Sequence, residues 1–120
     1  MKKIILAALI ISGFSLSSSA QSKVAQVVTI KTPTVQCDKC KSRIEEYLKR
    51  IDGVTFVNVK YKQKETLVKY LSDRTDVEII KAAIANAGYD ANEIAANPDS
   101  YKMLPKCCKK PEDGGGTQKH

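Results

Sequence analysis

Two cysteines three residues apart are the residues of this 120-residue chain best suited to chemistry: Cys37-Asp38-Lys39-Cys40. The preceding run, Val27 to Lys31, alternates and is rich in β-branched side chains, which favours a strand. The following run, Lys41 to Ile51, carries apolar residues at helical spacing. The two cysteines are therefore expected on a strand-to-helix connection, with Cys40 near the helix N-terminus.

This position favours the ionised form of a thiol. The first backbone N–H groups of a helix have no partner within the helix, so they attract an anion and lower the pKa of a nearby cysteine. A thiolate binds soft metal ions and also exchanges disulfides. The motif thus predicts either a soft-metal site or a redox pair, and its context must decide between them.

The pattern along the rest of the chain predicts alternating short elements. Cys40, Ile44, Leu48 and Ile51 fall on one face of the first helix, and the second helix begins with a capping box at residues 75–78. We expect strands at residues 25–32, 54–61, 66–71 and 89–94, a hairpin turn at 62–65, and helices at 41–51 and 77–87. This order predicts an α+β, ferredoxin-like βαββαβ sandwich, with an antiparallel four-stranded sheet and two helices on one face.

The first 20 residues are typical of a cleaved signal peptide. Lys2 and Lys3 precede an apolar stretch, and small residues precede a cleavage point after Ala20. The stretch is shorter than the about 20 residues of a membrane span, and no other candidate span is visible, so we expect a soluble mature protein in the periplasm.

The charge of the chain argues against a nucleic-acid partner. Loss of Lys2 and Lys3 with the signal peptide lowers the formal net charge from +7 to about +5. The remaining basic residues are spread along the chain rather than grouped with aromatic residues, which is typical of a solvated surface.

Residues 96–120 form a C-terminal extension. Pro98 can begin a short helix through Tyr101 and Leu104, and Pro105 ends it before Cys107-Cys108. From Lys109 onward the composition predicts a flexible tail.

The stretch from Val27 to Ile94 resembles the heavy-metal-associated domain family, which includes copper chaperones, domains of metal-pumping ATPases and periplasmic mercuric-ion binding proteins. The resemblance rests on the strand–CxxC–helix junction, on Asp52-Gly53-Val54 and on the run from Ala87 to Ala91. An exported single domain most resembles the periplasmic mercury-binding and copper-binding members.

The resemblance implies a heavy-metal-associated domain at residues 25–95 whose Cys37 and Cys40 bind one soft ion. Cu(I), the common cargo of the family, is the expected ion, with Hg(II), Zn(II) or Cd(II) as alternatives. It also implies a partner that takes the ion by exchange of thiolates: a metal-transporting membrane protein or another CxxC domain.

Four further residues have expected roles near the predicted metal site. Tyr89 matches an aromatic residue of the family and is expected either to screen the metal loop from solvent or to be an ordinary core tyrosine. Val35 stands where the family has methionine and is expected to pack under the loop. Cys107 and Cys108 are outside the family pattern. Because adjacent side chains diverge, at most one of them should reach the Cys37/Cys40 pair, and we expect an accessory role apart from it.

Two other functions stay open at this stage. One is a small thiol–disulfide redox protein, although the chain has no tryptophan and no Gly-Pro between its cysteines. The other is a structural or adaptor domain with an idle CxxC disulfide, or with a cross-bridge such as Cys37 to Cys107. His120 is the only histidine, so no Cys/His catalytic set can be assembled and we expect no enzyme.

Overall fold

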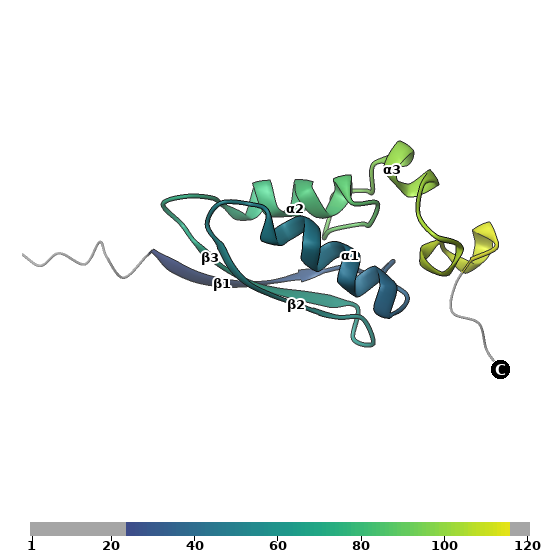
Figure 1. The fold of residues 1–120 in the computed structure, drawn as a ribbon, viewed down its shortest axis with the longest axis horizontal. Coiled ribbons are helices and arrows are strands. Elements are labelled where there is room, and N and C mark those ends of the chain that lie inside the picture. The colour runs from purple at the N-terminus through teal and green to yellow at the C-terminus, as the bar shows by residue number, and fades with distance from the viewer. Residues whose placement is uncertain (1–23, 116–120) are drawn as a thin grey trace, which may run out of the picture.

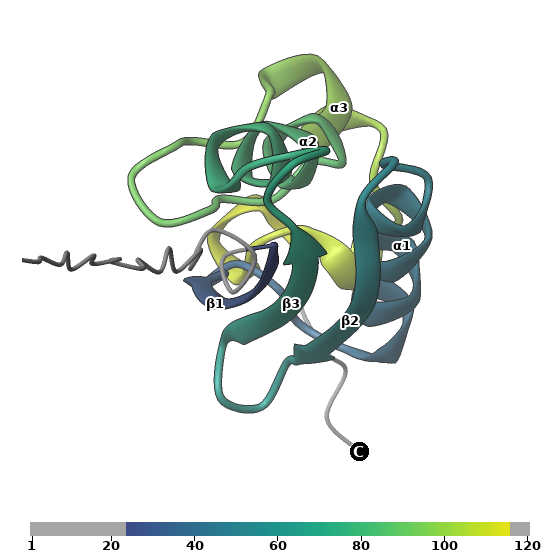
Figure 2. The ribbon, with the colours of Figure 1, turned by 90° about the vertical axis from the view of Figure 1, so that its left-hand side faces the viewer.

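A computed structural model describes residues 24–115. Its sheet has three antiparallel strands in the order β1-β3-β2. They are β1 (Ala25–Lys31), β2 (Val54–Lys60) and β3 (Glu65–Leu71). Figure 2 shows them side by side, and Figure 1 shows the two longer helices on one face of the sheet. The predicted α+β class, the antiparallel sheet and the placement of both helices are confirmed.

The strands alternate between a buried and an exposed face. Val68 of β3 is fully buried between Val28 of β1 and Val57 of β2, its partners in register. Val27 and Phe56 point to the opposite face and are exposed. The predicted hairpin joins β2 to β3, with Lys64 in the left-handed conformation at φ 61°. This period of two directs one row of β-branched side chains against the helices.

The first helix, α1 (Asp38–Lys49), begins three residues earlier than the sequence predicts. Cys40, Ile44 and Leu48 are its fully buried residues, one per turn along a single face. The predicted face is therefore confirmed for Cys40, Ile44 and Leu48, whereas Ile51 lies beyond the end of the helix and is half-buried. The earlier start places Cys40 inside the first helical turn and Cys37 at the N-cap.

The second helix, α2 (Val77–Asn86), is capped by Asp76. The Asp76 Oδ1 accepts a hydrogen bond from the Ile79 N–H at 2.9 Å. The predicted capping box is wrong, because the Thr75 hydroxyl is buried and has no hydrogen-bond partner among the described residues. Ile80 and Ile84 pack into the core, and Val77 is half-buried.

The predicted fourth strand at 89–94 is not formed in the described part of the chain. Ala91 and Ile94 instead bond to each other across a tight turn, with Asn92 at φ 52°. The turn meets the sheet only at the end of β1, where Asn92 N–H donates to the Lys31 carbonyl and Asn92 Oδ1 accepts from the Lys31 N–H. The segment alternates poorly, and Ala91 and Ile94 bond to each other while Asn92 bonds to the end of β1, so it adds no strand.

The C-terminal extension folds back on the domain. The predicted short helix forms as α3 (Pro98–Lys102), which ends before Leu104 and so is shorter than predicted. Two turns of 3-10 helix follow, η2 (Lys106–Cys108) and η3 (Pro111–Asp113). The flexible tail predicted from Lys109 is thus wrong as far as residue 115. Its remainder, and the predicted signal peptide, lie outside the described residues.

The cap of α2 gives a direct test. Asp76→Ala removes the acceptor for the Ile79 N–H and should lower the free energy of unfolding by about 1 kcal/mol. Thr75→Val removes a buried hydroxyl that has no partner and should leave stability unchanged or raise it. Urea denaturation measures both, and a Thr75→Val loss as large as that of Asp76→Ala would restore the capping box.

Candidate metal centre

Three thiols from two distant parts of the chain meet at the beginning of α1. The sulfur atoms of Cys37, Cys40 and Cys108 all lie within 4.8 Å of one another. The Cys37 and Cys40 Sγ atoms are 3.6 Å apart. Figure 1 places the η2 segment, which carries Cys108, beside the beginning of α1. The structure therefore brings one thiol of the extension to the predicted pair, although sequence analysis expected the extension to act apart from it.

The loop before Cys37 is held by contacts with several elements. Val35 is fully buried, as expected of a side chain packed under the loop, and its carbonyl accepts from the Lys64 Nζ at 2.5 Å. The Thr34 hydroxyl accepts from the Asp90 N–H at 3.1 Å. The Thr32 hydroxyl bonds that of Thr66 in β3 at 3.0 Å. These contacts fix the position from which Cys37 starts the helix.

The extension is anchored next to the thiols by its own side chains. Leu104 is buried, and its side chain packs on Gly88, where an added Cβ would lie 3.0 Å from a Leu104 methyl. Gly88 has φ +107°, so a side chain there would be strained as well as crowded. The Tyr101 hydroxyl accepts from the Lys110 N–H at 2.8 Å and donates to Asp113. The Leu104 and Tyr101 contacts bracket η2 and hold Cys108 in place.

Cys107, the neighbour of Cys108, takes no part in the sulfur cluster. Its side chain is half-buried. Its carbonyl accepts a long hydrogen bond from the Cys37 Sγ at 3.9 Å. The expectation that only one of the two adjacent thiols reaches the pair agrees with this geometry.

The electrostatics of the cluster favour a thiolate at Cys40. Hydrogen bonding from the Cys108 thiol is the largest cause, and it lowers the Cys40 pKa from 9.0 to about 5 against the effect of burial. The Gln36 N–H, which points at the Cys40 sulfur over 3.4 Å, adds to the lowering. The backbone effect predicted from the helix N-terminus is present, but the larger contribution comes from Cys108.

The other two thiols are shifted in the opposite direction. The pKa of Cys108 is raised, because its proton serves the hydrogen bond to Cys40 and because it is buried. Burial also raises the pKa of Cys37. The cluster therefore holds one ready thiolate and two thiols that must lose a proton to bind a metal ion.

Tyr89 lies beside the sulfur cluster. Its side chain is fully buried, and its hydroxyl has no hydrogen-bond partner within residues 24–115. Burial, followed by the neighbouring Cys108 and Cys40, raises its pKa. Tyr89 is thus a neutral, buried side chain, and its predicted screening of the metal loop stays a prediction beside its role as a core tyrosine.

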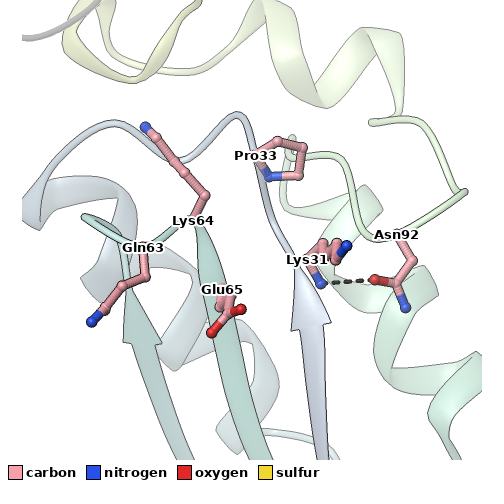
Figure 3. A pocket seen from close by; sticks show the side chains of 6 residues that line it. All are labelled: Lys31, Pro33, Gln63, Lys64, Glu65 and Asn92. Atoms are coloured by element: carbon pink, nitrogen blue, oxygen red, sulfur yellow. Dashed lines mark hydrogen bonds between the residues drawn. The ribbon is translucent and has the colours of Figure 1, made fainter.

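A separate hollow of about 530 Å³ lies at the end of the sheet. Figure 3 shows its six lining residues, Lys31, Pro33, Gln63, Lys64, Glu65 and Asn92. None of them is a cysteine, so this hollow is not the thiol site. No helix among the described residues has the length and apolar character that crossing a membrane requires.

The thiolate state of Cys40 can be measured directly. Ultraviolet thiolate absorbance of the reduced, metal-free protein should show one group titrating near pH 5. Cys108→Ala removes the main hydrogen-bond donor and should move that midpoint upward, while Cys107→Ala, the matched control, should not. An unchanged midpoint in Cys108→Ala would show that the backbone donors alone stabilise the thiolate.

The same shift predicts a dependence of stability on pH. Between about pH 5 and 9 the unfolded chain binds a proton at Cys40 that the folded chain does not. The contribution of Cys40 to the free energy of unfolding is therefore complete above pH 9 and is lost as the pH falls through about 5. Urea denaturation of reduced protein across this window, with Cys40→Ala as control, should show a positive slope that the variant loses.

Comparisons with known proteins agree with this geometry. Residues 29–90 match the model of the heavy-metal-associated domain. The chain is 32% identical over 80 residues, 67% of its length, to the mercuric transport protein periplasmic component of Shewanella putrefaciens, covering 88% of that protein. It is 34% identical over 61 residues, 51% of its length, to copper chaperone CopZ of Staphylococcus haemolyticus, covering 90% of that protein.

A solved structure supports the same assignment. Oxidized MerP from Ralstonia metallidurans aligns with a TM-score of 0.54 at 26% identity, over 57% of this chain and 94% of that one. The relatives are named as transport proteins and chaperones, in agreement with the prediction that the chain is not an enzyme. The match over more than half of the chain confirms the predicted resemblance, and the protein belongs to the heavy-metal-associated domain family.

Proposed function

We propose that this protein is an exported metallochaperone that binds one soft ion through Cys37 and Cys40 and passes it to a partner by exchange of thiolates. The observation that carries the proposal is the Cys37/Cys40 pair itself, with its two sulfurs 3.6 Å apart at the first turn of α1. One thiolate is ready at neutral pH, since the pKa of Cys40 is lowered to about 5. Soft ions prefer such ligands.

The donor set favours a d¹⁰ ion. Among residues 24–115 the cluster offers sulfur ligands without a histidine or carboxylate, and sulfur suits Cu(I) and Hg(II) better than harder ions. Cu(I) is our first choice, as the common cargo of the family, and one relative is named as a copper chaperone. Hg(II) comes next, since another relative is named as a mercuric transport protein. Zn(II) and Cd(II) are the alternatives for a site with more thiolates.

Transfer to a partner fits the uneven burial of the pair. Cys40 is fully buried, whereas Cys37 is partly exposed. An incoming thiolate can therefore replace Cys37 first and Cys40 last, and the ion is never left without a ligand. The partner would be a metal-transporting membrane protein or another CxxC domain. A net basic surface would speed its approach if the partner is acidic.

The location of the protein follows from its first 20 residues. We propose that they direct export and are removed after Ala20, so that the domain of residues 25–95 and the extension of residues 96–120 act in the periplasm. The periplasmic name of one relative supports this location.

A thiol–disulfide function is the second candidate, and the short distance between Cys37 and Cys40 favours it. The two sulfurs need to approach by only about 1.5 Å to form a bond of about 2.05 Å. The low pKa of Cys40 also suits thiol exchange. In an oxidising compartment this bond would block metal binding, so the redox state would control the metal site.

The site assignment is tested with the reduced protein under anaerobic conditions. The double variant Cys37→Ser, Cys40→Ser loses both proposed ligands. Loss of a hydrogen-bond partner of a metal ligand already lowers metal affinity by about 10- to 100-fold, so the double variant should lower the Cu(I) affinity by more than that. Competition with a Cu(I) chelator measures the affinity. Because Cys40 belongs to the buried core, circular dichroism must show that the variant is folded. Undiminished affinity in the folded variant would refute the assignment.

Export and redox state are tested on protein taken from the periplasm. Mass spectrometry should find a chain that begins at Gln21, with Cys37 bonded to a second cysteine when no metal is bound. An uncleaved chain in the cytoplasm would contradict the proposed export. Four free thiols without metal in periplasmic protein would show that oxidation does not control the site.

A further inference from the structure

We infer that Cys108 is a third ligand of the metal site, so that the C-terminal extension turns the CxxC pair into a three-thiolate centre. The inference rests on the proposed metal binding and specifies its coordination. The family pattern at Cys37 and Cys40 does not contain this ligand, since the family match ends at residue 90. It would bind soft d¹⁰ ions that accept three thiolates, such as Hg(II), Cd(II) and Cu(I).

The spacing of the sulfurs fits a triangle better than a line. With metal–sulfur bonds of about 2.3 Å, three sulfurs around one ion lie about 4 Å apart, whereas two sulfurs in a linear complex lie about 4.6 Å apart. Here all three sulfurs lie within 4.8 Å of one another, and Cys37 and Cys40 are 3.6 Å apart. A trigonal site needs small adjustments, while a linear Cys37/Cys40 complex must push its sulfurs apart by about 1 Å.

Burial supports the same arrangement. Cys40 is 0% exposed and Cys108 is 1% exposed, so an ion between them would be shielded from water. Of the three clustered cysteines, Cys37 is the one that is partly exposed. The sulfur of Cys108 lies within 4.8 Å of both other sulfurs, so one ion can contact all three.

The hydroxyl of Tyr89 is a second and independent observation. It is fully buried, its electrostatics are influenced by Cys40 and Cys108, and it makes no hydrogen bond of regular geometry within residues 24–115. A buried hydroxyl without a partner costs free energy. A metal-bound thiolate is a strong acceptor, and this hydroxyl can donate to one. The metal-bound form would thus satisfy a group that the metal-free form leaves unsatisfied.

Binding releases protons and changes no oxidation state. Each of the three sulfurs donates an electron pair to the ion, and each thiol that is still protonated gives its proton to solvent. A divalent ion with three thiolates leaves a charge of minus one. Lys106, Lys109 and Lys110 flank the two cysteines of the extension in sequence, and their positive charges oppose the negative charge of the complex.

The test compares Cys108→Ala with Cys107→Ala in the reduced, full-length mature protein loaded with one equivalent of Hg(II). X-ray absorption should find three sulfurs per mercury in the unsubstituted protein and in Cys107→Ala, and two in Cys108→Ala. The charge-transfer absorbance of the three-thiolate complex should disappear only in Cys108→Ala. Truncation after Leu104 should give the same two-sulfur site with one ion per chain, which separates loss of the ligand from a folding defect.

The outcomes separate this inference from the proposed function. Two sulfurs per mercury in both the unsubstituted protein and Cys108→Ala would overturn the third ligand and leave the Cys37/Cys40 site standing. Equal coordination numbers in Cys107→Ala and Cys108→Ala would also overturn it. Absence of binding by the unsubstituted protein, or full binding by the Cys37→Ser, Cys40→Ser variant, would overturn the proposed function instead.

Discussion

The burial of one ionised sulfur is the constraint on which the rest of the site depends. Cys40 occupies a core position of α1, in line with Ile44 and Leu48, yet its pKa favours the thiolate at neutral pH. A buried charge is costly unless hydrogen bonds stabilise it. The helix N-terminus provides backbone donors, and Cys108 provides the strongest one. The packing of the extension, which positions Cys108, therefore helps to stabilise the Cys40 thiolate.

This dependence explains how a short extension can matter so much. Leu104 fills the space above Gly88, a position where a side chain would clash with it. Gly88 also ends α2, so the glycine that closes the helix leaves room for the residue that anchors the extension. The Tyr101 hydroxyl then bonds the segment beyond Cys108 to the segment before it. The packing of Leu104 and the hydrogen bonds of Tyr101 thus position Cys108, which lies 68 residues after Cys40 in sequence.

Local pattern was enough to predict most of the fold and two of the three clustered thiols. Helical spacing identified the buried face of α1, alternation identified β1, β2 and β3, and the CxxC junction identified Cys37 and Cys40. The fourth strand failed because Asn92 adopts a left-handed turn that local alternation does not reveal. The place of Cys108 was missed because it depends on tertiary packing. The apolar side chains of Tyr101 and Leu104 are the feature of the sequence that indicates this packing. Such side chains in and after a short helix need an apolar surface to pack against, and the domain provides one.

The three-thiolate arrangement would also set the conditions for release. A pair of thiolates leaves an ion open to an incoming thiol, whereas a third thiolate occupies that place and must leave before transfer is complete. Cys108 can leave only if the extension moves. The two hydrogen bonds of Tyr101 oppose this motion weakly, because each contributes about 1 kcal/mol net to stability. Leu104 adds the burial of one side chain. A partner that binds the extension would therefore lower the barrier to transfer without touching the ion, which couples recognition of the partner to release of the metal.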